Sequence, residues 1–448
     1  MLTILQEREH DRNKNNEAFH DVIRDLFDIL HSWELTNGLS SNSSSSGSPS
    51  FSLILTAESP GDYDRIEESL DDIGRRRWAK SFLKIDGFQD IKSVRSIAKF
   101  RTPYSFGGRA LDPASMAILS SKMIGLQQVD WSFVDEQRRT LSMDDRRDRR
   151  YKFSQCLTQL PLQSLTHLKL ALRYIVPANH SWKIPSVLHP ADQEIDSLSR
   201  AIHAVSQAPN LRLLILENGM VLSTSIFGPV QTKAPVTASH PEAGTDKAKQ
   251  PLWPSLEHFI IQLSPVTPEG SWLLEGNANS MNPQYEYSSE DFDDVDDELM
   301  IDFDIENTDE PDRINERAEA IEAGDEPIWF YRSQMNTALF EPWVTQMALA
   351  TNHMPKLKWG ALSMTTKWRD TDDGEKQEFM VDVECKTVAA GRKNWEVRVG
   401  KSLEYVPDEK LVRFLDNDAG DEGSVIVQFD SSGREKLMRW SYQSLPPF

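Results

Sequence analysis

The feature that most constrains this chain is a short apolar motif that returns at long intervals. The motif is Leu-x-x-φ-x-φ, where φ is an apolar residue, and its clearest copies are Leu126–Trp131, Leu165–Leu170, Leu211–Leu216 and Leu256–Ile261. Their leading leucines are 39, 46 and 45 residues apart, and a fifth copy begins 101 residues later at Leu357. Apolar residues that alternate in so short a run are typical of a strand.

Amphipathic helices are expected before these strands. A helix near 192–207, which Ala208-Pro209 ends, presents four apolar side chains on one face: Ile195, Leu198, Ile202 and Val205. Asp112-Pro113 supplies an N-cap and a first helical residue for another helix. Further helices are expected near 19–33 and 332–353.

The helix-turn-strand units predict an α/β fold, namely an irregular leucine-rich-repeat-like solenoid in which each unit buries one face against the next. The intervals exceed the roughly 20–29 residues of ordinary leucine-rich repeats, the usual Asn is missing, and the fifth copy carries Gly360 at an apolar position. A βα protein in which helices and strands simply alternate therefore stays open as the alternative.

The pattern changes at about residue 365. Phe379–Val383 and Trp395–Val399 alternate apolar and polar residues, as half-buried strands do. A helix is expected from Pro407 and a last strand over Val425–Phe429. We expect these elements to form a small C-terminal α/β cap, because a solenoid needs one to cover its last apolar face.

Composition divides the chain into five parts: a flexible N-terminus (1–16), a leucine-rich-like α/β region (17–275), an acidic disordered insert (276–326), a last helix-strand unit (327–364) and the cap (365–448). A Ser-rich loop at 39–50 and a second loop at 230–250 interrupt the first α/β region. These loops and the insert hold too few apolar residues to offset their ordering entropy.

The acidic insert carries most of the net charge of −21. Nineteen acidic and two basic side chains lie between Glu286 and Glu326, which leaves −4 for the rest of the chain. Nucleic-acid binding is disfavoured, because its affinity comes largely from basic contacts to phosphates. Within the insert, Ser288 and Ser289 precede acidic residues, so we expect them to be phosphorylation sites.

The chain gives no sign of export or of a membrane span. No apolar run approaches about 18 residues, and the N-terminus becomes charged after five residues instead of continuing into the apolar core of a signal peptide. Cys156 and Cys385 are the only cysteines, which indicates a reducing compartment. We expect a cytoplasmic or nuclear protein, or one present in both.

No motif predicts catalysis, a cofactor or a metal ion. Gly400-Lys-Ser402 ends like a phosphate-binding loop, but Trp395 stands where that loop needs its first Gly. Asp291–Asp297 resembles a calcium loop, but Asp296 replaces the central Gly and Asp302 the closing Glu, so a solvated acidic loop is favoured. The ten histidines form no HxxxH pair, and no GxSxG nucleophile motif is present.

Three further sets of residues are weighed as binding groups. The basic clusters Arg75–Arg77 and Arg146–Arg150 suit phosphates, but acidic residues interleave the second, which predicts a solvated, self-paired helix face. Cys156 lies among apolar residues and is expected in the core. Seven tryptophans near strand ends are expected mostly in the core, with some on a recognition face: Trp131, Trp182, Trp253, Trp272, Trp329, Trp343 and Trp359.

The order of segments resembles a family of fungal F-box-like proteins, which have an N-terminal F-box, an irregular leucine-rich-like α/β region and a C-terminal domain of unknown function. The resemblance spans about 17–440 and is carried by Ile23–Trp33, Phe51–Pro60, the turns Pro209-Asn-Leu211 and Pro254-Ser-Leu256, Trp395–Val399 and Pro407–Leu415. The Leu-Pro-x-Glu opening of an F-box is not seen. The resemblance therefore implies the substrate-receptor part of a ubiquitin ligase without its module for the cullin-type adaptor.

These observations predict a non-catalytic scaffold for protein–protein interaction, with protein partners and with neither nucleic acid nor membrane. The identity of the partner and the residues that bind it stay unknown at this stage. Two alternatives remain open: an unrecognised α/β enzyme, and a binder of basic proteins that acts through the acidic insert.

Overall fold

The computed structural model describes fifteen parts of the chain, and the statements below refer to these residues: 9–38, 50–57, 82–85, 87–103, 109–135, 143–192, 195–228, 252–278, 321, 324, 327–369, 376–388, 392–400, 403–420 and 423–430. Their main feature is one ten-stranded sheet with the order β1-β3-β5-β6-β7-β8-β11-β12-β13-β14. The strands thus lie side by side in the order of the sequence.

The ten strands have the following bounds: β1 Phe51–Ile54, β3 Ile97–Thr102, β5 Gln128–Val134, β6 His167–Arg173, β7 Leu213–Met220, β8 His258–Leu263, β11 Trp359–Arg369, β12 Lys376–Thr387, β13 Lys393–Gly400 and β14 Ser424–Asp430. Two small sheets pair β2 (Phe82–Leu83) with β4 (Ala110–Leu111), and β9 (Leu274–Glu275) with β10 (Gln334–Met335). Every neighbouring pair from β1 to β11 is parallel, and β13 and β14 are also parallel. Only β12 runs against both of its neighbours.

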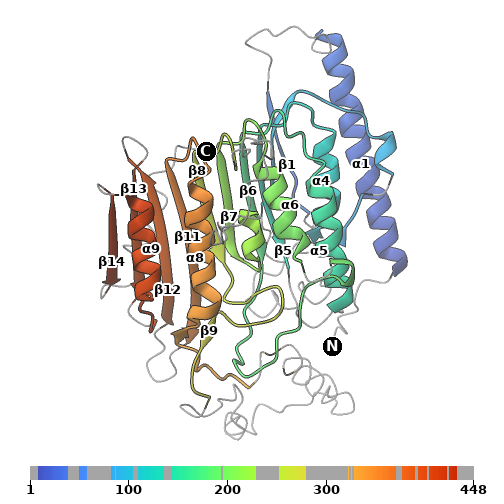
Figure 1. Cartoon of the computed structure of the whole chain (residues 1–448). Helices are drawn as coiled ribbons and strands as arrows, with labels where there is room; N and C mark the ends of the chain where they lie inside the picture. Colours follow the sequence, from blue (N-terminus) through green and yellow to red (C-terminus); the bar gives the residue numbers. More distant parts are fainter. Residues whose placement is uncertain are drawn as a thin grey trace, which may run out of the picture.

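Six α-helices of the described residues lie on one face of this sheet (Figure 1). They are α1 Glu9–Thr36, α4 Pro113–Ser121, α5 Met143–Leu157, α6 Ser197–Ser206, α8 Thr337–Thr351 and α9 Glu409–Ala419. A helix between two parallel strands returns the chain to the starting edge, so each unit adds the next strand beside the last. The molecule is therefore a mixed α/β protein with two layers, helices over a mostly parallel sheet.

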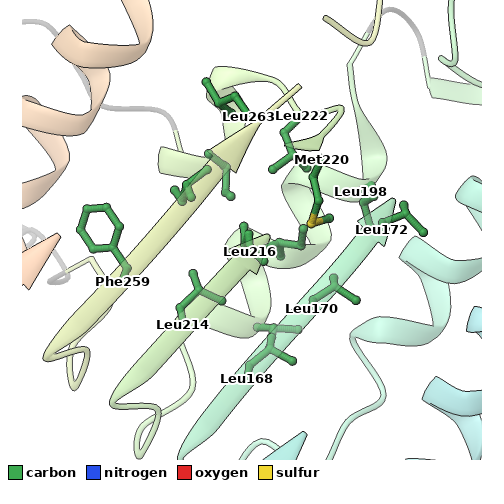
Figure 2. Close-up of a cluster of buried hydrophobic side chains, with 14 of the residues drawn as sticks. Leu168, Leu170, Leu172, Leu198, Leu214, Leu216, Met220, Leu222, Phe259 and Leu263 are labelled. Atoms are coloured by element: carbon green, nitrogen blue, oxygen red, sulfur yellow. The ribbon is translucent and has the colours of Figure 1, made fainter. Parts of the chain in front are cut away.

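Strand register places apolar side chains in rows that face the helices. One row runs across nine strands: Phe100, Val129, Leu168, Leu214, Phe259, Gly360, Cys385, Trp395 and Val425. Figure 2 shows the leucines of β6 and β7 in such rows, with Leu198 of α6 and Phe259 and Leu263 of β8 packed around them. The rows form one continuous core.

The leucines that lead each motif have a common place in this core. Leu126, Leu165, Leu211, Leu256 and Leu357 are all buried, each two residues before its strand begins. The glycine that breaks the fifth motif also has a packing reason. A Cβ atom on Gly360 would lie 2.3 Å from the Phe259 ring, because that ring already fills the space.

Two helices begin with the same side-chain arrangement. Asp112 accepts hydrogen bonds from the Ser115 backbone N–H at 2.9 Å and from its hydroxyl at 2.8 Å at the start of α4. Asp196 does the same with Ser199 at the start of α6. Each Asp satisfies backbone groups that the first helical turn leaves unpaired, so the Asp-x-x-Ser sequence fixes where each helix starts.

The structure confirms the α/β class and most of the predicted elements, with three differences. Helix α1 begins at Glu9, so residues 9–16, which were assigned to the N-terminal segment, are helical. The strands expected in a separate C-terminal cap, β12 to β14, continue the main sheet. Strand β3 was not predicted. Nearly all of the Ser-rich loop, the loop at 230–250 and most of the acidic insert lie outside the described residues.

Candidate functional site

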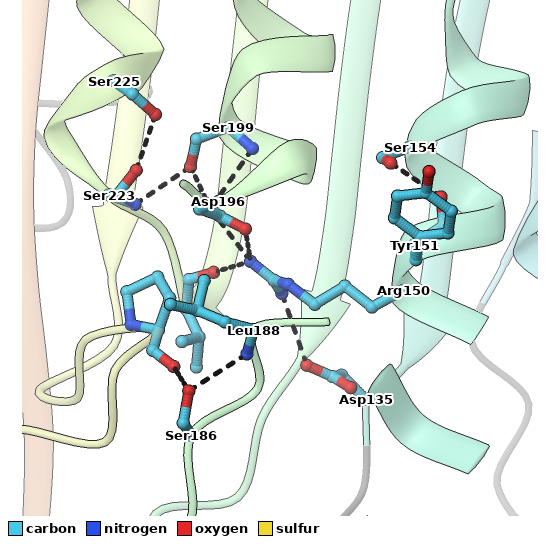
Figure 3. A network of polar contacts seen from close by, with 12 residues as sticks. Asp135, Arg150, Tyr151, Ser154, Ser186, Leu188, Asp196, Ser199, Ser223 and Ser225 are labelled. Carbon is cyan, nitrogen blue, oxygen red and sulfur yellow. Dashed lines mark hydrogen bonds and ion pairs between the residues drawn. The ribbon is translucent and has the colours of Figure 1, made fainter. Parts of the chain in front are cut away.

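Charged side chains gather in several places among the described residues, and two of these places are candidate sites. The first lies at the carboxyl ends of the central strands. Asp135, directly after β5, accepts hydrogen bonds from Arg146 of α5 at 2.8 Å and 3.0 Å. Arg150, one turn further along α5, donates to Asp196 at 3.1 Å and to the Val221 backbone carbonyl, and lies 3.7 Å from Asp135. Figure 3 shows Arg150 reaching between the two carboxylates.

This network is internal, because all four of these charged side chains are buried. Burial raises the pKa of Asp135, but the Arg146 charge and its hydrogen bonds outweigh that effect and hold the pKa below its ordinary value. The prediction that Arg146 and Arg150 form a solvated, self-paired face is therefore wrong. The network connects β5, α5 and α6 through buried ion pairs. Its charged groups are therefore not accessible to a ligand in solution.

The second place is the sheet face opposite the helices, here called the open face. Among the described residues, every helix contributes its buried apolar side chains to the core on the other face. On β3 to β7 the open face carries a ladder of charges: Arg101, Asp130, Lys169 and Glu217. Arg101 pairs with Asp130 at 3.0 Å and Lys169 with Glu217 at 2.7 Å. These side chains remain 14% to 42% exposed, so the ladder is accessible to a partner.

An apolar strip lies next to the ladder on the same face. It consists of Leu213 and Ile215 of β7, Ile260 of β8, and Trp359 and Ala361 of β11, which form a cluster of strand residues alone. Parallel register aligns Ile215, Ile260 and Ala361 in one row. All five side chains are between 1% and 6% exposed.

A cluster around Arg398 of β13, here called the Arg398 cluster, follows the strip. The Arg398 guanidinium lies 3.4 Å from Asp382, 2.9 Å from Glu384 and 2.6 Å from Glu396. Glu384 also forms an ion pair with Lys386 at 3.0 Å and accepts a hydrogen bond from the Trp359 indole N–H at 3.2 Å. The indole joins the strip to the cluster, so the two form one continuous surface across β7 to β13.

Three carboxylates share one guanidinium and one ammonium, and the electrostatics of Asp382 reflect this. Burial and the charge of Glu384 raise the pKa of Asp382 to about 7, against the opposing effect of Arg398. One of its oxygens, Oδ1, is buried and has no hydrogen-bond partner among the described residues. A buried acceptor without a donor is costly, so this oxygen marks a position that a donor would stabilise.

The raised pKa makes stability depend on pH. Because the pKa of Asp382 is higher in the folded chain than in the unfolded chain, its contribution is full below about pH 4 and is lost as pH rises through about 7. Asp382→Asn removes this titration. As pH rises from 5.5 to 8.5, we expect the free energy of unfolding of the wild type to fall by about 2 kcal/mol relative to that of the variant. Urea unfolding at each pH measures this difference.

Glu409→Gln provides the control for this experiment, because Glu409 is an exposed carboxylate on α9. Its pH dependence should match that of the wild type. If the wild type and the Asp382→Asn variant show the same pH dependence of stability, the pKa of Asp382 is not raised in the folded chain.

The other residues singled out in the sequence fall into three groups. Trp131, Trp253, Trp272 and Trp343 pack in the interior, whereas Trp359 lies on the open face. Cys156 is half-buried against the core, and burial raises the pKa of its thiol. Ser288, Ser289, Asp291–Asp297 and Arg75–Arg77 lie outside the described residues.

The Arg398 cluster is the feature that sequence reasoning missed. The alternation of β12 and β13 predicts half-buried strands, whereas Asp382, Glu384 and Arg398 at their polar positions are buried and paired across the strands. The signal lay in complementary charges on two alternating strands that follow one another closely. No group of three His, Cys, Asp or Glu side chains suited to a metal ion occurs in the described parts of the chain.

Comparisons with known proteins add nothing to this geometry. A scan against protein-family models, a search of curated proteins and a search of solved structures each gave no match. Within the described ranges, no helix is long and apolar enough to cross a membrane.

Proposed function

We propose that this protein is a non-catalytic scaffold that binds protein partners on its open face. The observation that carries the proposal is the charge ladder, which stays accessible on a sheet face where no helix of the described residues packs. Parallel sheets usually have helices on both faces. A parallel sheet with helices on one face alone offers a broad second surface, which repeat scaffolds use for recognition.

The finer fold supports the same proposal. Within the main sheet, each strand pairs only with the strands of that sheet that come before and after it in the sequence, and helices α4, α5 and α6 contact one another in series. Contacts between adjacent units alone are expected of a solenoid, so this order supports the proposal of an irregular leucine-rich-repeat-like solenoid. The F-box-like resemblance suggests the substrate-receptor part of a ubiquitin ligase as the biological setting.

Affinity capture with quantitative mass spectrometry tests the proposal. The double variant Arg101→Ala, Lys169→Ala removes both cations of the ladder, and these partly exposed pairs contribute only about 0–1 kcal/mol each to stability. We expect the variant to lose about 10-fold in recovery of specific partners, which is the effect of about 1.4 kcal/mol of binding energy.

The matched control is Arg413→Ala, which removes an exposed Arg from α9 in the helix layer. It should recover the same partners as the wild type. Equal recovery by all three proteins would exclude the ladder as the binding surface. The presence or absence of adaptor and cullin subunits among the captured proteins tests the ubiquitin-ligase setting separately.

A further inference from the structure

The open face has two halves, the charge ladder and the apolar strip with the Arg398 cluster. The side chains of the first half are partly exposed and those of the second are mostly buried. The ladder on β3 to β7 remains 14% to 42% exposed, as expected for a sheet face without a covering layer. On β7 to β13, by contrast, the apolar strip and Asp382, Glu384 and Arg398 are all buried. Among the described residues, neither a helix nor a loop adds a buried apolar side chain to the strip, which consists of residues of β7, β8 and β11 alone. The burial of this half therefore points to a covering segment outside the described ranges.

We propose that the C-terminal segment, residues 431–448, docks on the apolar strip and the Arg398 cluster. The described chain ends at Asp430 of β14, which pairs with Gly400 of β13. The strip lies three to five strands away on β11, β8 and β7. At about 4.8 Å between strands this is roughly 14–24 Å, and 18 extended residues span up to about 60 Å. The segment is long enough to cross the face.

The chemistry of the segment matches the surface in order as well as in kind. Its sequence is SSGREKLMRWSYQSLPPF, in which three basic residues, Arg434, Lys436 and Arg439, come before most of the large apolar ones. A path from β14 towards β7 crosses the Arg398 cluster first and the apolar strip second. Basic side chains thus meet three carboxylates, and Trp440, Tyr442, Leu445 and Phe448 reach the strip.

The unpartnered oxygen of Asp382 supports this match. Asp382 lies between the strip and Arg398, opposite Ser363 on one side and Arg398 on the other. Its buried Oδ1 has no donor among the described residues, and a hydrogen-bond donor of the segment supplies one. Most of the acidic insert also lies outside the described residues, but it carries a strong negative charge that the carboxylates repel.

Thiol labelling of the full-length chain tests the docking. Ala361→Cys, in a Cys156→Ser background, places a thiol in the middle of the strip, while the native Cys385 is buried in the core. Ser132→Cys places a matched thiol on β5, on the same face but beyond the strip. We expect Leu437→Asp with Trp440→Asp to speed labelling of the Ala361→Cys thiol about 10-fold, because the covering segment opens. Labelling of the Ser132→Cys thiol should not change.

Two controls keep the result interpretable. Ser431→Asp with Ser432→Asp adds the same charge before the basic residues and should leave labelling unchanged. A synthetic peptide of residues 431–448, added in excess to the Leu437→Asp, Trp440→Asp chain, should restore the slow rate. Unchanged labelling in a chain with a native circular-dichroism spectrum would overturn the proposal, as would failure of the peptide to restore protection. The measurement uses the purified chain alone, so it is independent of the proposed function.

Discussion

Asp135→Ala is expected to lower the free energy of unfolding by about 3–5 kcal/mol. The substitution leaves the guanidiniums of Arg146 and Arg150 buried, and Arg146 loses both of its hydrogen bonds to the carboxylate. Removing one partner of a buried pair costs far more than the pair contributes, because an uncompensated charge remains away from water. Urea unfolding followed by circular dichroism at pH 7 measures the loss.

The control is Asp144→Ala on the same helix. Asp144 is 86% exposed and pairs with Arg147 at 2.9 Å, so its loss is expected to cost less than about 1 kcal/mol. Because the pKa of Asp135 is lowered in the folded state, its contribution is full above about pH 4 and disappears as pH falls through the folded value. Equal losses in the free energy of unfolding for the two variants at pH 7 would show that the buried network does not stabilise the fold more than an exposed ion pair does.

The sequence could not predict this network, because the pairs that form are not the nearest in the chain. Asp144, Asp145 and Asp148 lie among the arginines and suggested local pairing. The structure instead turns Arg146 and Arg150 inward, to Asp135 at 2.8 Å and to Asp196 at 3.1 Å. The choice depends on which side of α5 faces the sheet, and the apolar period of that helix is too weak to show it.

Most of the α/β array, in contrast, followed from local patterns. The leading leucines and the alternating strands were visible because burial on one face repeats at fixed spacing. Strand β3 was missed for a specific reason: Ile97-x-x-Phe100-x-Thr102 has the same spacing, but Ile replaces the leading Leu and Thr the last apolar residue. A motif that admitted β-branched residues would have included it.

The C-terminal strands show the limit of local patterns more clearly. Their alternation predicted strands correctly, but it carries no information about which strand each one pairs with. The cap was expected because the pattern changes at about residue 365 and because a solenoid needs a cap over its last apolar face. In the structure β12 pairs with β11 along its whole length, so the sheet continues without a break.

Lys393→Met tests whether the continuous sheet also unfolds as one unit. The substitution is expected to lower the free energy of unfolding by about 3–5 kcal/mol. The buried Lys393 ammonium of β13 donates to Thr351 at 2.9 Å and to Asn352 at 2.7 Å, at the end of α8. It also pairs with Asp418 of α9 at 3.0 Å. Its charge compensates both the carboxylate and the negative end of the α8 dipole. Methionine keeps the apolar stem but leaves Asp418 buried and without its cation.

Because Lys393 joins the last helix-strand unit to the expected cap, its loss should act on both sides of that boundary. Hydrogen exchange should show amides of α8 losing protection together with those of β13 and α9. Arg413→Met, which removes only an exposed pair with Glu409, should leave both groups protected. Loss confined to β13 and α9 would mean that the C-terminal part opens as a separate unit. Joint loss would mean that β12 to β14 are the last members of one cooperative array, so the Arg398 cluster and the apolar strip belong to a single rigid surface.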